Sequence, residues 1–239
     1  MTDSLPVVFV HGIRLSGAAW TTVAECVGRD RAVRAVDLPG HGARRGGVFT
    51  LPGAAAAVLE AVDEVGGRAL VVGHSLGGYV GIAAAAKDPG RVAGLVVAGS
   101  TTVPSPAATA PFSVMHRVLT SRRDGGKRVS ERLFGAVLPA PVATAISAGG
   151  IATEVIPDVV RALRGFDVLR DLAAYPGPVW LINGGHDHLR WHERRFAAAN
   201  PDARLIVVPG GGHYLPMARP VEFARLVRDA AAAVPGVRV

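Results

Sequence analysis

A serine stands among glycines in the stretch VVGHSLGGYVG, residues 71–81. Ser75 lies between Gly73 and Gly77, which makes the local pattern G-x-S-x-G. Glycine inside a helix costs about 1 kcal/mol relative to alanine, so helix stability does not favour this composition. The pattern follows the apolar run ALVV and precedes an alanine-rich stretch, and a sharp strand-to-helix turn there would hold a serine hydroxyl clear of a sheet. These residues predict that Ser75 is a nucleophile.

A serine hydroxyl is a weak nucleophile and needs a base and an acid beside it. Five histidines follow Ser75, and of these only His213 lies in a glycine-rich loop, PGGGHYLP, directly after an apolar run. Of the seven aspartates between Ser75 and His213, only Asp187 closely follows an apolar run, in WLINGGHD. Functional groups of α/β proteins gather at the carboxyl ends of parallel strands, which favours Asp187 as the acid.

The stretch around Asp187 also contains His186, His188, His192 and Glu193, which together suggest a metal site. The spacing lacks the i, i+4 histidine pair of the H-E-x-x-H motif. We therefore interpret the stretch as the loop that carries the acid, and we expect neither a metal nor another cofactor.

Short apolar runs alternate with longer helical patterns along the chain. The strand-like runs cover residues 6–10, 31–36, 69–73, 93–99, 178–182 and 203–208, and the helical patterns lie near 18–27, 51–65, 76–87, 190–199 and 218–233. This alternation indicates βαβ units and a mostly parallel sheet of about six strands with helices on both faces. At 239 residues, the chain is predicted to form a single domain, 1–239.

Residues 101–176 interrupt this alternation because they contain no strand-like run. Four short helical patterns occur there, near 112–120, 127–136, 141–147 and 156–164. Connections of this length are uncommon in a compact domain unless they carry function, so the 101–176 segment is predicted to be a helical cap or lid. An ordinary set of crossover helices is the alternative.

The G-x-S-x-G stretch, together with FVHGIR at 9–14 and DLPGHG at 37–42, resembles the α/β-hydrolase family over nearly the whole chain. The resemblance implies a three-layer α/β/α fold with a mostly parallel sheet and a helical cap insertion. In that family the catalytic residues follow in the order Ser, Asp or Glu, His. Carried over, the resemblance assigns Ser75 as nucleophile, Asp187 as acid and His213 as base.

The same resemblance implies an oxyanion hole formed by the backbone N–H groups of Ile13 and Leu76. His11 and Gly12 would then shape the loop rather than react, and Asp37 and His41 of DLPGHG would be structural. The first strand-like run begins within the first ten residues, so the antiparallel hairpin that opens the family's full sheet is expected to be absent or reduced. A serine nucleophile argues against the alkyl-enzyme chemistry of family members that use aspartate.

The resemblance implies a cofactor-independent serine hydrolase that cleaves an ester-type bond of a small or medium molecule through an acyl-enzyme on Ser75, as a carboxylesterase or lactonase does. Carbon-carbon bond hydrolysis uses a similar set of residues, and a ligand-binding receptor of the same fold remains open. A thioesterase or acyltransferase is a further alternative, because basic residues that could meet a phosphate cluster at Arg117, Arg122, Arg123, Lys127, Arg128 and Arg132.

The net charge of +7 and the pI of about 10.6 raise nucleic-acid binding as a question. The basic residues are spread along the chain without an aromatic-interleaved stripe, so neither a nucleic-acid nor a membrane partner is expected.

One cysteine, Cys26, excludes an intramolecular disulfide framework. The N-terminal apolar run is too short for a signal peptide or a membrane span, so a cytoplasmic protein with a small-molecule substrate is expected; the sequence leaves the oligomeric state open.

Overall fold

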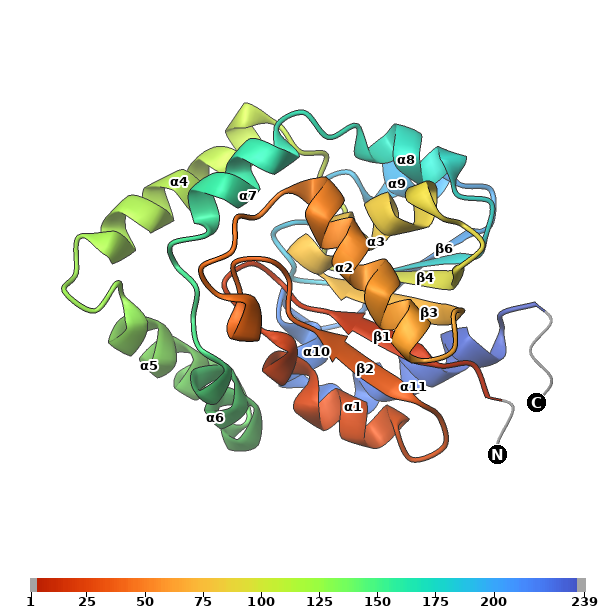
Figure 1. Cartoon of the computed structure of the whole chain (residues 1–239), viewed down its shortest axis with the longest axis horizontal. Helices are drawn as coiled ribbons and strands as arrows, with labels where there is room; N and C mark the ends of the chain where they lie inside the picture. Colours follow the sequence, from red (N-terminus) through yellow and green to blue (C-terminus); the bar gives the residue numbers. More distant parts are fainter. Residues whose placement is uncertain (1–3, 236–239) are drawn as a thin grey trace.

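A six-stranded parallel sheet forms the centre of the computed structural model, which describes residues 4–235 (Figure 1). The strands are β1 (Val7–Val10), β2 (Val33–Val36), β3 (Ala69–His74), β4 (Val92–Ala98), β5 (Val179–Gly184) and β6 (Ala203–Val208). Their order is β2-β1-β3-β4-β5-β6, and each neighbouring pair is parallel. All six predicted strand-like runs form strands, and no antiparallel hairpin precedes β1 within the described residues.

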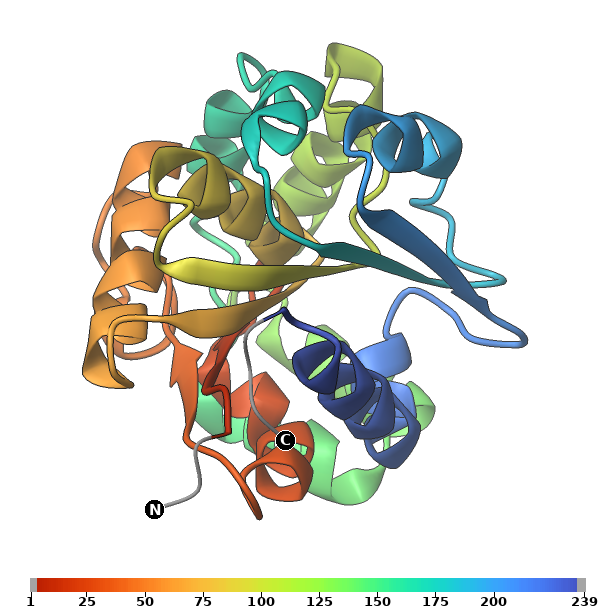
Figure 2. The same ribbon diagram turned by 90° about the vertical axis from the view of Figure 1, so that its right-hand side faces the viewer.

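Helices cover both faces of the sheet, as Figure 2 shows. One face carries α2 (Leu51–Glu64), α3 (Leu76–Lys87), α8 (Val168–Ala174) and α9 (Glu193–Ala199), and the other carries α1 (Thr21–Val27) and α11 (Pro220–Ala232). Every residue of β1, β3, β4 and β5 is buried, which is why these runs are apolar throughout, whereas the edge strands β2 and β6 are partly exposed. The predicted three-layer α/β/α fold is confirmed.

Five helices lie in the segment between β4 and β5. Besides α8, they are α4 (Pro106–Thr120), α5 (Lys127–Val137), α6 (Ala140–Gly149) and α7 (Ile156–Leu163), which lie at one end of the sheet. Figure 1 shows two pairs, α4 with α7 and α5 with α6, joined by the turn between α4 and α5. Phe134 of α5 and Ile146 of α6 pack with Leu15 and Met217 in a small apolar cluster separate from the two clusters on the sheet faces. The segment therefore packs directly on the loops that follow β1 and β6.

The helices α4 and α8 differ from the sequence prediction. Helix α4 begins at Pro106 rather than near 112, because Ser105 caps it by accepting a hydrogen bond from the Ala108 N–H (3.1 Å) and because proline suits the first helical position. Helix α8 was not predicted. It is only seven residues long and begins where the side chain of Asp167 accepts a hydrogen bond from the Arg170 N–H (3.2 Å).

The helical pattern predicted near 218–233 forms α11, and a further short helix, α10 (Leu215–Ala218), precedes it. Two short 3₁₀ helices, η1 (Gly17–Trp20) and η2 (Gly42–Arg44), follow β1 and β2. Among residues 4–235, no helix is both long and apolar enough to cross a membrane.

Candidate active site

Ser75 occupies the turn between β3 and α3 with φ 52° and ψ −118°, a conformation that non-glycine residues rarely adopt. Three hydrogen bonds hold its backbone there: its N–H donates to the Ala98 carbonyl (2.9 Å), and its carbonyl accepts from the Ser100 hydroxyl (2.7 Å) and from the Gly78 N–H (3.0 Å). The turn therefore has the strained geometry predicted for a nucleophile elbow. The role of Ser100 was not predicted, although its position just after β4 was a usable signal.

The glycines on both sides of Ser75 have no room for a side chain. A Cβ on Gly73 would overlap the carbonyl of Gly77, and a Cβ on Gly77 would overlap the carbonyl of Val10 in the neighbouring strand β1. The close contact between strand, elbow and helix thus explains the glycine composition that helix stability alone disfavours.

His213 and Asp187 form the second part of the site. The His213 Nδ1 atom lies 3.1 Å from both carboxylate oxygens of Asp187, a buried residue that is 4% exposed. Burial opposes ionisation of Asp187, but the hydrogen bonds from His213 and from the Leu189 N–H outweigh it and hold the pKa of Asp187 below its ordinary value. An ionised Asp187 accepts from Nδ1 and leaves Nε2 of His213 as the atom available for proton transfer.

Ser75 and His213 line one cavity, which we call the polar chamber. Its volume is about 160 Å³, and it is lined by Gly12, Ile13, Arg14, Leu15, His74, Ser75, Phe112, Met115, Phe134, His188, Leu189, His213 and Tyr214. Within the described residues the Ser75 hydroxyl makes no hydrogen bond to His213. Such contacts are often long in a free enzyme and shorten when substrate binds.

The loop after β1 passes directly against the elbow. A Cβ on Gly12 would lie 3.3 Å from the Cβ of Ser75 and 3.1 Å from Nδ1 of His74. Among residues 4–235, the N–H of Ile13 donates to no protein acceptor, and Leu76 begins α3, where a helix leaves its N–H unpaired. Two unpaired N–H groups therefore flank Ser75, as an oxyanion hole requires.

His11, His41 and Asp37 have structural contacts, and Nδ1 of His41 lies 3.0 Å from the backbone carbonyl of Pro39. Nε2 of His11 accepts from the Leu38 N–H (3.1 Å), so its Nδ1 donates to the Gly12 carbonyl (2.9 Å). Asp37 accepts hydrogen bonds from the N–H groups of Gly17 and Ala43, each at 2.7 Å. These bonds fix the loops after β1 and β2 and agree with the structural roles expected for these residues.

His74, the variable residue before the nucleophile, joins two parts of the site. Its Nε2 lies 2.9 Å from the backbone carbonyl of His213, so this nitrogen is the donor. Burial, followed by repulsion from His213, lowers the pKa of His74 to about 3. Burial, followed by repulsion from His41, likewise lowers the pKa of His11 to about 3. Both imidazoles are therefore neutral at physiological pH.

These two histidines make the protein sensitive to acid. Unfolded histidine binds a proton below about pH 6.5, whereas His11 and His74 in the folded state bind one only near pH 3. The unfolded state takes up protons first, so the free energy of unfolding falls as pH decreases through this window, by about 1.4 kcal/mol per pH unit for each histidine.

His74→Gln keeps a donor for the His213 carbonyl. We expect this variant to take up one proton fewer on unfolding, so that its free energy of unfolding depends less steeply on pH. Urea unfolding between pH 4 and 8 measures it: the two proteins should differ by a constant amount above pH 7 and show different slopes below pH 6. Parallel curves over the whole range would contradict the assignment of His74 as a neutral buried group.

The three histidines near Asp187 have different surroundings. His192 Nδ1 accepts from the Val103 N–H (3.1 Å), His188 packs its ring 5.3 Å from that of His213, and His186 is exposed. Among the described residues, no group of three or more His, Cys, Asp or Glu side chains is arranged to hold a metal ion. Trp191, which lies beside this stretch, is 71% exposed.

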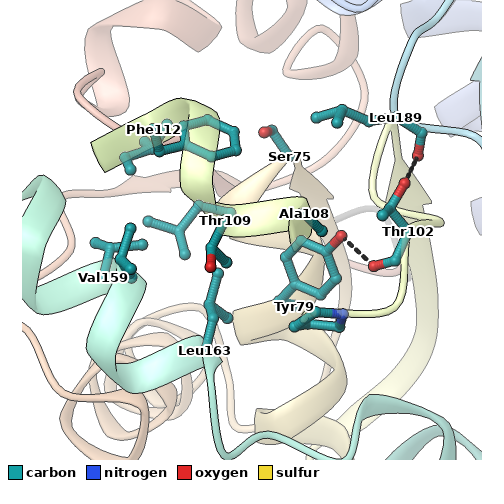
Figure 3. Close-up of a pocket in the computed structure, with 13 residues that line it drawn as sticks. Ser75, Tyr79, Thr102, Ala108, Thr109, Phe112, Val159, Leu163 and Leu189 are labelled. Atoms are coloured by element: carbon teal, nitrogen blue, oxygen red, sulfur yellow. Dashed lines mark hydrogen bonds between the residues drawn. The ribbon is translucent and has the colours of Figure 1, made fainter. Parts of the chain in front are cut away.

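A second cavity is also lined by Ser75, and we call it the apolar chamber (Figure 3); it shares Ile13, Ser75, Phe112 and Leu189 with the polar chamber. Its volume is about 50 Å³. Figure 3 shows Thr109 and Phe112 of α4 and Val159 and Leu163 of α7 gathered beside Tyr79. The wall is fixed by hydrogen bonds from the Tyr79 hydroxyl to the Thr102 carbonyl (2.6 Å) and from the Thr102 hydroxyl to the Leu189 carbonyl (2.7 Å). Helices of the 101–176 segment thus supply much of this chamber.

The six basic residues that suggested phosphate recognition lie on α4, on α5 and on the turn between them, and all are exposed. They are Arg117, Arg122, Arg123, Lys127, Arg128 and Arg132. None lines either chamber, so they contribute no charge to the wall around Ser75.

The chain belongs to the alpha/beta hydrolase family, whose family model matches residues 7–226. It is similar to the RutD protein of Pseudomonas savastanoi pv. phaseolicola, named as a carbamate hydrolase (28% identical; 95% of this chain, 93% of that protein). It is also similar to a pimeloyl-[acyl-carrier protein] methyl ester esterase of Nitrosomonas europaea (26% identical; 90% of this chain, 91% of that protein). These relatives support hydrolase activity, and they differ in the bond that their names describe.

The fold is shared with the enol-lactonase of Burkholderia xenovorans LB400, with a TM-score of 0.78 at 19% identity over 96% of this chain and 92% of that one. At this identity the likeness shows the fold alone.

Proposed function

We propose that this chain is a cofactor-independent serine hydrolase that cleaves an ester-type bond of a small or medium molecule. The observation that carries the proposal is the strained serine at the carboxyl end of β3, which shares the polar chamber with a histidine bonded to a buried carboxylate. Ser75 is the nucleophile, His213 the base and Asp187 the residue that orients the imidazole.

In this mechanism, Nε2 of His213 takes the proton of the Ser75 hydroxyl as the oxygen attacks the substrate carbonyl. The negative charge that develops on the carbonyl oxygen is stabilised by the N–H groups of Ile13 and Leu76, at the start of α3. Ionised Asp187 stabilises the imidazolium that forms. His213 then gives its proton to the leaving group. In the second half of the reaction, His213 takes a proton from water as the water oxygen attacks the acyl carbonyl, and returns it to the Ser75 oxygen when the bond to the acyl group breaks.

The apolar chamber suits a short acyl group. A cavity of about 50 Å³ has room for only a few water-sized groups, so it admits a short chain and not a long one. Its apolar walls favour a hydrocarbon chain, and Leu76 lies in the wall where the acyl carbonyl would meet the oxyanion hole. Helices α4 and α7 would then act as a cap that limits acyl length.

The test is intact-mass analysis after exposure to a small alkyl fluorophosphonate, which forms a bond from an activated serine oxygen to phosphorus as fluoride leaves. We expect one adduct on the wild-type protein and none on Ser75→Ala. The reagent needs no knowledge of the natural substrate.

Ser121→Ala is a matched control, because Ser121 is an exposed serine at the end of α4 and should not affect labelling. Folded wild-type protein that gains no adduct would contradict the proposed nucleophile and favour a ligand-binding receptor of the same fold.

A further inference from the structure

Arg14 is a buried cation in the wall of the polar chamber. It follows Ile13 in the loop after β1, its backbone has a positive φ of 68°, and the residue is only 8% exposed. Within residues 4–235 it forms no ion pair, and no acidic side chain lines the chamber. An uncompensated charge in such a place costs several kcal/mol of stability, so Arg14 calls for an explanation other than packing.

The contacts of Arg14 satisfy only part of its guanidinium. Nη2 donates to the hydroxyls of Ser130 (2.5 Å) and Thr153 (3.4 Å), and Nη1 reaches only the sulfur of Met115 (3.9 Å). Nε is buried and has no protein partner. Neutral hydroxyls fix the position of the group but do not compensate its charge. Burial lowers the pKa of Arg14, yet arginine has a pKa high enough to remain charged.

Arg14 is therefore unlike the other basic residues near the chamber. The six basic side chains of α4, α5 and the turn between them are exposed to solvent, whereas Arg14 lies inside, in the same wall as Ser75 and His213. Tyr214 lines the chamber too, and burial raises the pKa of its phenol, which keeps the hydroxyl protonated and able to donate. A planar guanidinium beside a phenol donor matches a compact planar anion such as a carboxylate.

The placement of His213 indicates which part of the substrate carries this anion. His213 must protonate the leaving group. The leaving group therefore lies on the same side of Ser75 as His213. His213 and Arg14 line the polar chamber and not the apolar chamber, whereas Leu76 lines the apolar chamber and not the polar one. The acyl group and the leaving group would thus occupy separate chambers with different chemistry.

We propose that the leaving-group portion of the substrate carries a carboxylate, and that Arg14 binds this carboxylate in the polar chamber. The inference rests on the proposed serine hydrolase function and adds a substrate class to it: esters of hydroxy acids with a short apolar acyl group.

The test compares two isosteric esters, O-butyryl glycolate and O-butyryl glycolamide, which differ by a negative charge at the leaving group. A charged hydrogen-bonded contact corresponds to a preference of about ten- to hundredfold. We expect wild-type kcat/KM to favour the glycolate by at least about tenfold. No preference for the glycolate would overturn the proposal.

Arg14→Met removes the charge with an unbranched side chain, which adds no branching at a position of positive φ. We expect the glycolate-to-glycolamide ratio to fall to about one or below in this variant, and Arg14→Lys to retain part of the preference. Arg117→Met, on the exposed face of α4, is the matched control and should keep the wild-type ratio. A ratio that Arg14→Met leaves unchanged would exclude Arg14 as the binding group.

Two further measurements test where on the substrate the carboxylate lies and whether its binding can be detected without turnover. Monomethyl succinate carries its carboxylate on the acyl side, and a wild-type preference for it over the glycolate would overturn the placement at the leaving group. Calorimetry on Ser75→Ala should show tighter binding of O-butyryl glycolate than of the glycolamide, and equal binding would contradict the proposal without any turnover. Fluorophosphonate labelling does not depend on Arg14, so a labelled enzyme without glycolate preference would reject only this inference.

Discussion

Replacing Ser75 with alanine is expected to reduce kcat/KM for a butyryl ester by about four orders of magnitude or more. The reason is chemical: without the hydroxyl no acyl-enzyme forms, and the remaining oxyanion hole and binding chambers give only a residual acceleration. Ester hydrolysis followed at pH 8 under single-turnover conditions measures the loss and separates it from slow product release.

The fold should tolerate this substitution, because the hydroxyl of Ser75 makes no hydrogen bond within the described residues and the strained backbone is held through its N–H and carbonyl. Alanine at positive φ is as strained as serine, so the free energy of unfolding should change by less than about 1 kcal/mol. Ser121→Ala should keep full activity. Turnover by a folded Ser75→Ala protein within tenfold of wild type would mean that another residue starts the reaction.

The second large effect is expected at Gly77. In Gly77→Ala the new Cβ would overlap the backbone carbonyl of Val10, and neither α3 nor β1 can shift without disturbing the elbow between them. We expect the variant to lose more than about 3 kcal/mol of unfolding free energy, measured by urea denaturation, and to lose activity with it.

Gly135→Ala provides the matched control. Gly135 lies in α5, and a Cβ there would meet no atom within 4 Å. Alanine in an exposed helix position is more favourable than glycine by about 1 kcal/mol, so this variant should be slightly more stable than wild type. Equal stability of Gly77→Ala and Gly135→Ala would show that α3 does not contact β1 as closely as the structure has it.

Local signals in the sequence were sufficient for the sheet and for the candidates of the triad. The strands β1, β3, β4 and β5 are buried on both faces, which requires continuous apolar runs that can be recognised without the structure. Gly73 and Gly77 mark the elbow because backbone contacts there leave no room for a side chain. Because Asp187 follows a strand, the sequence predicted that it would lie at the carboxyl end of the sheet, where His213 also lies.

The start of α4 and the existence of α8 were harder to predict. In α4, Ser105 and Pro106, which resemble part of a loop, act as the N-terminal cap and the first helical residue. In α8, seven residues give too short a pattern to recognise, and packing against α3 and α9 stabilises a helix that its own sequence would not.

Only the tertiary structure decided which polar residues share a cavity. Arg14 is followed by the apolar residue Leu15 and looks like an ordinary loop cation in the sequence, and His74 looks like the variable position of a motif. Their burial depends on α5 and on the loop after β6, which lie more than a hundred residues away in the chain. The sequence by itself determined the fold class and the candidate triad, because these depend on local patterns of apolar residues and glycines. The burial of the Arg14 charge in the chamber that Ser75 lines depends on contacts between residues far apart in the sequence, and no local sequence pattern predicts such contacts.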